Sequence, residues 1–119
     1  MSVIDELKSF YEEFALALET RDLDRLSQLY TDDAVFLRNE TAPVIGNDQI
    51  GQLFHGPPTS KKTTFEVGEV LEDGDLIIDI GMILVDGGRV SLFVGVYRRQ
   101  ANGSLKMAVE VPMKAPSSL

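Results

Sequence analysis

Apolar residues in the first part of the chain recur with the period of an α-helix. After a capping pair formed by Ser2 and Asp5, the apolar stripe consists of Val3, Leu7, Phe10, Tyr11, Phe14 and Leu18. Arg21-Asp22 interrupts this stripe, and Asp22 is a favourable N-cap for a second helix. That second helix would carry Leu23, Leu26, Leu29 and Tyr30. The pattern therefore predicts one long helix followed by a shorter one.

Turn-forming residues divide the middle of the chain into short elements. Thr31-Asp32-Asp33 is predicted to end the second helix, residues 34–38 to form a short strand, and residues 39–43 to form a loop. Gly46-Asn47 indicates the start of a third, short helix through Ile50, Leu53 and Phe54. Gly56-Pro57-Pro58 ends that helix, because proline lacks an amide donor and the residue before it avoids helical backbone angles.

The second half of the chain has the composition of strands. Four segments are rich in Val, Ile, Leu and Phe: Thr63 to Leu71, Leu76 to Val85, Arg89 to Gln100, and Ser104 to Lys114. The residues between them include Gly74, Gly87 and Gly103, and glycine adopts the positive φ of hairpin turns at little cost. Helices followed by a meander of strands predict an α+β fold.

Apolar residues occupy both faces of these strands. In residues 76–84 the even positions are all apolar, whereas the odd positions are Ile77, Asp79, Gly81 and Ile83. In the next strand, Leu92, Val94 and Val96 lie on one face, and Phe93, Gly95 and Tyr97 lie on the other. A sheet with one face in water would alternate more clearly between apolar and polar residues. We therefore expect helices to cover one face and a second copy of the chain to cover the other, as a homodimer.

Composition excludes several classes of function. The 119 residues suit a single domain over residues 1–119, and no apolar run approaches the ~20 residues of a membrane span. The N-terminus lacks the basic-then-apolar pattern of a signal peptide, so we expect a cytoplasmic protein without membrane contact. Cysteine is absent, which excludes disulfides, thiolate catalysis and zinc–sulfur sites. A formal net charge of −8 disfavours nucleic-acid binding.

Several segments carry a family resemblance. Residues 30–36 read YTDDAVF, and Pro43, Gly46 and Ile50 form the pattern P-x-x-G-x-x-x-I. Residues 21–24 match a bend between two helices, and residues 103–107 are similar to a last strand in which Leu105 replaces the usual Trp. Together they resemble the SnoaL-like, ketosteroid isomerase-like branch of the NTF2-like superfamily. The resemblance covers almost the whole chain and implies a cystatin-like cone, in which about three N-terminal helices pack on a strongly curved, mostly antiparallel sheet that encloses a pocket.

The same resemblance implies a chemistry that this chain has lost. Steroid isomerases of the superfamily use a base aspartate, a tyrosine and a protonated aspartate. The matching positions in this chain hold Arg38, Phe14 and Gly95, and arginine does not take up a proton near neutral pH. We therefore expect no ketosteroid isomerase activity.

Three charged residues are candidates for a pocket. The family position that matches Arg38 faces inward, so we predict that Arg38 binds an anion at the pocket rim. Asp79 interrupts an apolar run, and lies either in the pocket opposite Arg38 or at a hydrated edge position. Glu110 matches an acidic position common in the family's last strand. It is either a general base with a pKa raised by burial, or a salt-bridge partner of Arg98 or Arg99.

The single histidine and the aromatic residues leave more than one interpretation. His55 ends the predicted third helix, where it either complements the helix dipole or has a minor role in proton transfer. One histidine without neighbouring ligands makes a poor metal site, so we predict no functional metal and no cofactor. The aromatic residues either pack in the core or line an apolar pocket. They are Tyr11, Phe14, Tyr30, Phe36, Phe54, Phe93 and Tyr97.

Three classes of function stay open at this point. The first is a cofactor-free isomerase, lyase, cyclase or hydrolase for an apolar ligand with an anionic group, with Glu110, Asp79 or His55 as catalytic candidates. The second is a non-catalytic carrier or sensor of such a ligand. The third is a dimeric interaction module. The sequence contains no phosphate loop, nucleotide fingerprint or nucleophile-elbow serine.

Overall fold

Two helices at the start of the chain follow the predicted pattern. The computed structural model describes residues 2–38, 41–57 and 60–113. Helix α1 (Val3–Thr20) begins at Ser2, whose hydroxyl accepts a hydrogen bond from the Asp5 amide at 3.1 Å. Arg21 ends α1 with a left-handed φ of 53°, and Asp22 caps α2 (Leu23–Gln28). None of the described helices is long and apolar enough to cross a membrane.

A third helix and six strands complete the fold. The helix is α3 (Asn47–Gln52), and the strands are β1 (Tyr30–Phe36), β2 (Val44–Ile45), β3 (Thr63–Asp73), β4 (Leu76–Val85), β5 (Gly88–Arg99) and β6 (Leu105–Pro112). The strands form one sheet in the order β2-β1-β6-β5-β4-β3, and every neighbouring pair is antiparallel except β1 with β6. The α+β prediction is confirmed, and the four long strands lie close to their predicted bounds. Lys114, the predicted end of the last strand, lies outside the described residues.

The segment after α2 differs from its prediction. Thr31, Asp32 and Asp33 do not end a helix, because they lie within β1, which begins where Tyr30 pairs with Met107 of β6. Pairing with β6 outweighs the turn preference of the two aspartates, which stay exposed on the strand. The strand ends at Phe36, two residues before the predicted end. The short strand β2, which pairs with the end of β1, was not predicted.

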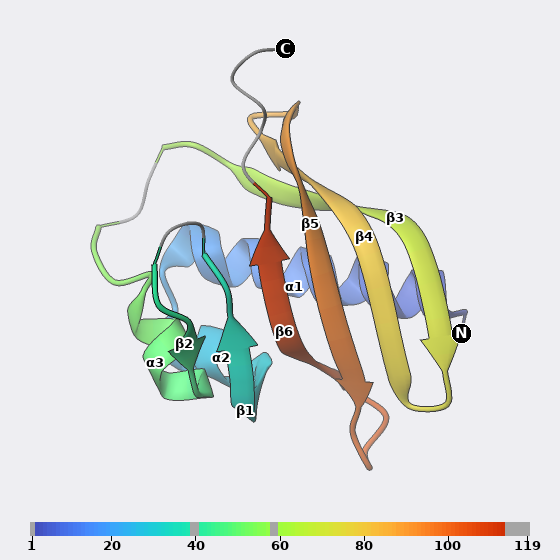
Figure 1. The fold of residues 1–119 in the computed structure, drawn as a ribbon. Helices are drawn as coiled ribbons and strands as arrows, with labels where there is room; N and C mark the ends of the chain where they lie inside the picture. Colours follow the sequence, from blue (N-terminus) through green and yellow to red (C-terminus); the bar gives the residue numbers. More distant parts are fainter. Residues whose placement is uncertain (1, 39–40, 58–59, 114–119) are drawn as a thin grey trace.

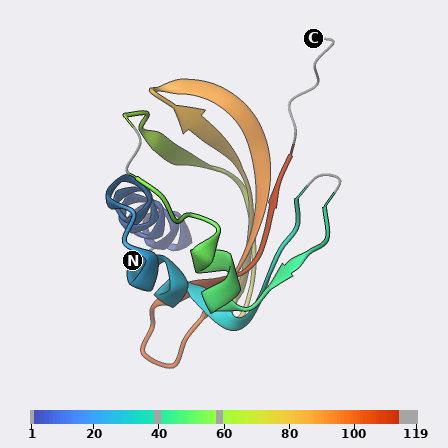
Figure 2. The same ribbon diagram turned by 90° about the vertical axis from the view of Figure 1, so that its left-hand side faces the viewer.

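The sheet is strongly curved, and the helices lie on its concave side, as Figure 1 and Figure 2 show. Register irregularities interrupt the pairing of β3 with β4, β4 with β5, and β5 with β6, and such bulges bend the strands in which they occur. Helix α1 runs across the concave face, where its buried side chains meet those of the sheet in an aromatic-rich core. The rings in mutual contact there include Phe10, Tyr11, Phe14, Phe65, Phe93 and Tyr97.

The two faces of the central strands differ in exposure. On the concave face, Ile77 and Phe93 are 0% and 1% exposed, so the prediction that helices cover this face is confirmed. On the convex face, Ile80 and Leu92 are 40% and 45% exposed, and the apolar residues between them are half-buried. No element in the described ranges covers the convex face of β4 and β5 (Figure 1).

Candidate functional site

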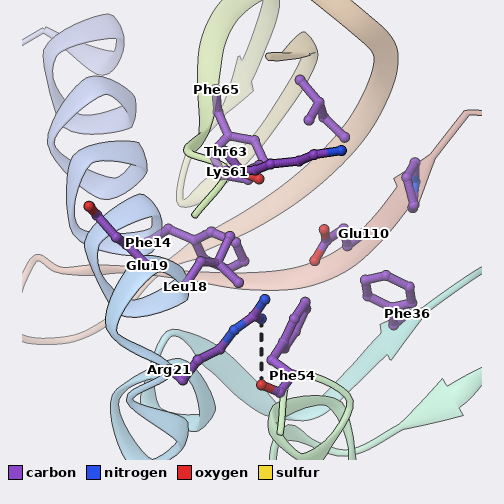
Figure 3. A pocket seen from close by; sticks show the side chains of 12 residues that line it. Phe14, Leu18, Glu19, Arg21, Phe36, Phe54, Lys61, Thr63, Phe65 and Glu110 are labelled. Atoms are coloured by element: carbon purple, nitrogen blue, oxygen red, sulfur yellow. Dashed lines mark hydrogen bonds between the residues drawn. The ribbon is translucent and has the colours of Figure 1, made fainter. Parts of the chain in front are cut away.

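A cavity of about 340 Å³ lies between the end of α1, the segment that leads into β3, and the curved sheet (Figure 3). Its apolar walls come from Phe14, Leu18, Phe36, Phe54, Phe65, Ile83 and Pro112. Its polar lining residues are Glu19, Arg21, Lys61, Thr63 and Glu110. Small-molecule sites typically measure about 300 to 1,000 Å³, so this cavity suits a small, largely apolar ligand.

Glu110 places a buried carboxyl group in the cavity wall. It projects from β6 toward the concave side and is only 7% exposed. The Tyr30 hydroxyl donates a hydrogen bond to Glu110 Oε1 at 2.5 Å. Burial raises the pKa of Glu110 to about 7, although the hydrogen bond from Tyr30 acts in the opposite direction. The carboxyl group can therefore both accept and release a proton near neutral pH.

Glu110 forms no ion pair with another described residue. Among the described residues, neither Arg98 nor Arg99 forms the salt bridge that was the alternative interpretation of Glu110. Arg99 instead donates to Glu6 at 2.8 Å and to Glu72 at 3.0 Å, which ties α1 to β3. The carboxyl group of Glu110 is therefore available to a molecule in the cavity.

Arg21 brings a positive charge to the same cavity. The left-handed backbone that ends α1 directs its side chain into the space between Phe54 and Glu110 (Figure 3). Its Nη1 lies 3.5 Å from the Phe54 carbonyl oxygen, a long hydrogen bond, and its Nε is buried with no hydrogen-bond partner among the described residues. A buried donor without a partner is costly, so this guanidinium is suited to receive an anionic group from a ligand.

A second polar cluster lies deeper in the core and does not line the cavity. Asp79 is 0% exposed, and its Oδ2 accepts a hydrogen bond from the Tyr11 hydroxyl at 2.5 Å. Its Oδ1 accepts from the Gly68 amide at 2.9 Å, and the Tyr11 hydroxyl also lies 2.6 Å from the Tyr97 hydroxyl. Burial raises the pKa of Asp79, and the bonds from Tyr11 and Gly68 counteract that increase. Burial likewise raises the pKa of Tyr11, of Tyr30 and of Tyr97.

The structure separates the predicted site residues into three groups. Phe14, Phe36, Phe54 and Glu110 line the cavity, and Tyr30 reaches it through its bond to Glu110. Tyr11, Asp79 and Tyr97 form the deeper cluster, and Phe93 packs beside them. Arg38 and His55 are exposed and lie outside the cavity lining. The His55 ring bonds through Nδ1 to the Gln52 carbonyl oxygen at 2.7 Å, within its own turn.

The structure does not place Arg38 in the lining of this cavity. Because β1 ends at Phe36, the strand alternation that would turn Arg38 inward does not continue to residue 38. No salt bridge joins Arg38 to Asp79 or Glu110 in the described part of the chain. Arg21 was missed, because sequence reasoning assigned it only to the break between two helices. A signal for Arg21 was present in the sequence: it ends one predicted helix directly before the N-cap of the next. A residue at such a bend has a fixed backbone, and its side chain therefore has a defined direction.

Metal-ligating side chains do not gather in the described residues. There, no group of three or more His, Asp or Glu side chains is arranged to hold a metal ion. The prediction that the protein has no functional metal stays a prediction.

Comparison with solved structures places the fold in a known group. The CaMKII hub from S. rosetta is 16% identical, aligns over 97% of this chain and 98% of its own, and gives a TM-score of 0.78. A protein of unknown function with a cystatin-like fold from Nostoc punctiforme PCC 73102 is 15% identical over 98% and 96% of the two chains, with a TM-score of 0.78. A ketosteroid isomerase-like protein from Erwinia carotovora atroseptica SCRI1043 is 16% identical over 95% and 97%, with a TM-score of 0.72.

These likenesses establish the cystatin-like, NTF2-like fold that the resemblance implied. No curated protein matches this chain. The SnoaL-like domain family matches residues 9–106, which run from within α1 to the start of β6. The chain therefore belongs to the SnoaL-like domain family.

Proposed function

We propose that the cavity binds a small, largely apolar molecule with an anionic group, and that Glu110 transfers a proton to or from that molecule. The observation that carries this proposal is the placement of Glu110, a buried carboxyl group with no ion pair among the described residues, in a cavity whose walls are mainly aromatic and aliphatic. Arg21 supports the anionic part of the ligand, because its Nε is buried and has no described partner.

The reaction class that this arrangement favours is a cofactor-free isomerisation. In its ionised form Glu110 removes a proton from a carbon atom of the ligand and becomes a neutral acid. The neutral acid exchanges its proton with solvent and returns a proton to a different atom of the ligand, so no co-reactant is consumed. A pKa of about 7 suits both steps, because the two protonation states of Glu110 are then nearly equal in free energy at neutral pH. Ketosteroid isomerisation is not part of the proposal, since Arg38, Phe14 and Gly95 stand at the family's three catalytic positions.

The test compares anionic ligands with matched neutral ones. Small aromatic carboxylates and their amides are titrated by calorimetry against wild type, Arg21→Met and Arg38→Met. We expect Arg21→Met to weaken carboxylate binding by about tenfold or more, which corresponds to ~1.4 kcal/mol, and to leave the amides unchanged. The control Arg38→Met should leave both unchanged, because Arg38 is exposed and outside the cavity. Equal losses for carboxylates and amides in Arg21→Met would contradict an anion-binding role.

Turnover distinguishes the enzyme from a carrier. Any carboxylate that binds is then incubated with the protein in deuterium oxide, and incorporation of deuterium into its C–H bonds is followed by mass spectrometry. We expect exchange with wild type and its loss in Glu110→Gln, with binding retained. Saturable binding without exchange in wild type would favour the carrier function and contradict the catalytic one.

A second candidate function is self-association through the convex face of the sheet. The observation that favours it is the exposure of Ile80 and Leu92 at the centre of a face that bears mainly apolar side chains. One of the similar structures is a CaMKII hub, and this likeness supports an interaction module as the second candidate. Light scattering tests it, since a dimer has twice the mass of the 13.1 kDa chain.

A further inference from the structure

Two buried carboxyl groups face each other across a glycine on the concave side of the sheet. Asp79 of β4 pairs with Gly95 of β5, and Gly95 pairs with Glu110 of β6, so the three residues form one row on the same face. Neighbouring strands lie ~4.8 Å apart, which separates the backbones of the two acidic residues by about 10 Å. The space between the two carboxyl groups lies above Gly95, which has no side chain.

Tyr97 fills that space. A Cβ atom on residue 95 would lie 2.2 Å from the Tyr97 hydroxyl, so the tyrosine takes this position only because residue 95 is glycine. The hydroxyl lies 2.6 Å from that of Tyr11, which donates to Asp79 at 2.5 Å. Glu110 and Asp79 both act on Tyr97 through their charges, so its hydroxyl is within electrostatic reach of the two carboxyl groups.

The hydroxyl chain has two self-consistent arrangements, because each phenol carries one proton. When Asp79 is ionised, Tyr97 donates to Tyr11 and Tyr11 donates to Asp79. When Asp79 is protonated, it donates to Tyr11 and Tyr11 donates to Tyr97. In that second arrangement the proton of Tyr97 is released from the chain and can point toward Glu110.

We propose that Asp79 controls the protonation of Glu110 through the hydroxyl groups of Tyr11 and Tyr97. An ionised Asp79 draws the Tyr97 proton away from Glu110 and adds a like charge, and both effects favour the neutral form of Glu110. A neutral Asp79 removes that charge and frees the Tyr97 hydroxyl to stabilise the Glu110 carboxylate. Asp79 is thus a positioning residue, because it lies outside the cavity lining. The idea rests on the proposed function of Glu110, but its test requires no ligand.

Other polar and charged groups also surround the two carboxyl groups. Glu110 accepts from Tyr30 of β1, and the charged residues that share its cavity are Glu19, Arg21 and Lys61. Asp79 accepts from the Gly68 amide of β3 in addition to Tyr11 of α1. The Tyr97 hydroxyl lies above Gly95, the residue that separates Asp79 from Glu110 in the row.

The experiment follows the titration of Glu110 by carbon-13 NMR of protein labelled at the glutamate carboxyl carbons. The Glu110 resonance is identified by its absence in Glu110→Gln. We expect Asp79→Asn to lower the pKa of Glu110 by about two units. About one unit is the effect of one charge ~10 Å away at an effective dielectric constant of about 20, and about one more comes from the Tyr97 hydroxyl that is released toward Glu110. The matched control Asp75→Asn, an exposed aspartate in the turn before β4, should leave the titration unchanged.

A double-variant comparison separates the hydroxyl chain from a direct field. In a Tyr97→Phe background, Asp79→Asn should shift the Glu110 titration by about one unit, the direct charge effect alone. An equal shift with and without the Tyr97 hydroxyl would overturn the proposal, as would a shift below about 0.3 units in the single variant. If Asp79→Asn does not fold, Tyr11→Phe replaces it, since it releases Tyr97 while keeping the Asp79 carboxyl. The pKa of Glu110 should then fall, and a constant or higher value would contradict control by Asp79. If these shifts are observed but no ligand is turned over, the proposed function alone is contradicted.

Discussion

The concave and convex faces of the central strands show opposite relations between polarity and burial. The concave face is buried, yet it carries the carboxyl groups of Asp79 and Glu110 and the hydroxyl of Tyr97. The convex face is partly exposed, yet Ile80 and Leu92 at its centre are apolar. Hydrophobicity alone would assign the faces the other way round. Burying polar groups and exposing apolar ones both cost free energy in the isolated chain. The buried polar groups therefore motivate the proposed ligand site on the concave face, and the exposed apolar residues motivate the proposed contact surface on the convex face.

The largest expected effect is a difference in stability between alanine variants of two adjacent residues of β5. Phe93 is 1% exposed on the concave face and Leu92 is 45% exposed on the convex face. Phe93→Ala should lower the free energy of unfolding by ~3–5 kcal/mol, because it empties a packed position among aromatic rings. Leu92→Ala should cost about 1 kcal/mol or less. Urea unfolding at several protein concentrations measures both values, and equal losses would break the distinction between the faces.

The pH dependence of stability tests the concave face. Because burial raises the folded-state pKa of Glu110 to about 7 from a usual 4.5, its contribution is fully present below pH 4.5 and is lost as the pH rises through 7. Wild type should therefore lose ~3 kcal/mol more than Glu110→Gln between these values. Glu6, whose pKa is lowered by its bond with Arg99, contributes in the opposite sense and loses its effect as the pH falls. Parallel pH profiles for wild type and Glu110→Gln would contradict the buried titration.

A methyl group on the concave face should disturb the tyrosine that lies above it. Gly95→Ala should destabilise the protein by ~1–3 kcal/mol, because the new Cβ meets the Tyr97 hydroxyl at 2.2 Å. The matched control is Gly88→Ala on the same strand, where the nearest atom, the Val85 carbonyl oxygen, lies 3.6 Å away. The control should change stability by about 0.5 kcal/mol or less. Thermal unfolding compares them, and a Gly95→Ala variant as stable as the control would show that Tyr97 has another position.

Charges on the convex face should have the smallest effect on the stability of the chain and a clear effect on its association. We expect wild type to form a dimer of twice 13.1 kDa, and Ile80→Lys with Leu92→Lys to give the monomer mass. Leu16→Lys on α1 is the control, because Leu16 is 60% exposed but lies on a helix. Light scattering at micromolar concentration measures the masses. A monomeric wild type would remove the contact-surface interpretation of the convex face.

Local sequence signals predicted most of the fold. Ser2 and Asp22 cap their helices as expected, and the strand from Leu76 to Val85 has its predicted bounds, because caps and hairpins depend on near neighbours in the chain. The strand β1 was placed too late, since its start is set by parallel pairing with β6, which no local pattern encodes. As a result, the predicted strand included Arg38, whereas β1 ends at Phe36.

The site was predicted only in part for a related physical reason. Strand alternation and family resemblance identified Glu110, and Asp79 stood out as a charge within an apolar run. Neither signal shows which concave residues face a cavity and which bond to one another. Tyr11, Asp79 and Tyr97 therefore stayed candidates for the pocket, although they form a separate cluster. The role of Arg21 depends on a backbone bend and on the position of Phe54, which come from different elements.

The parallel pairing of β1 with β6 also determines the order in which the molecule is completed during synthesis. Tyr30 and Glu110 are 80 residues apart, and closing a loop of that length costs ~4 kcal/mol of chain entropy before any contact is gained. Until residues 105–112 have left the ribosome, β1 and β5 are open edges that other nascent chains can pair with. The strand that closes this gap is the one that carries Glu110. Glu110 therefore takes its place in the cavity wall at the same step in which β6 joins β1 to β5. A chain in which β6 has not yet paired has no assembled cavity.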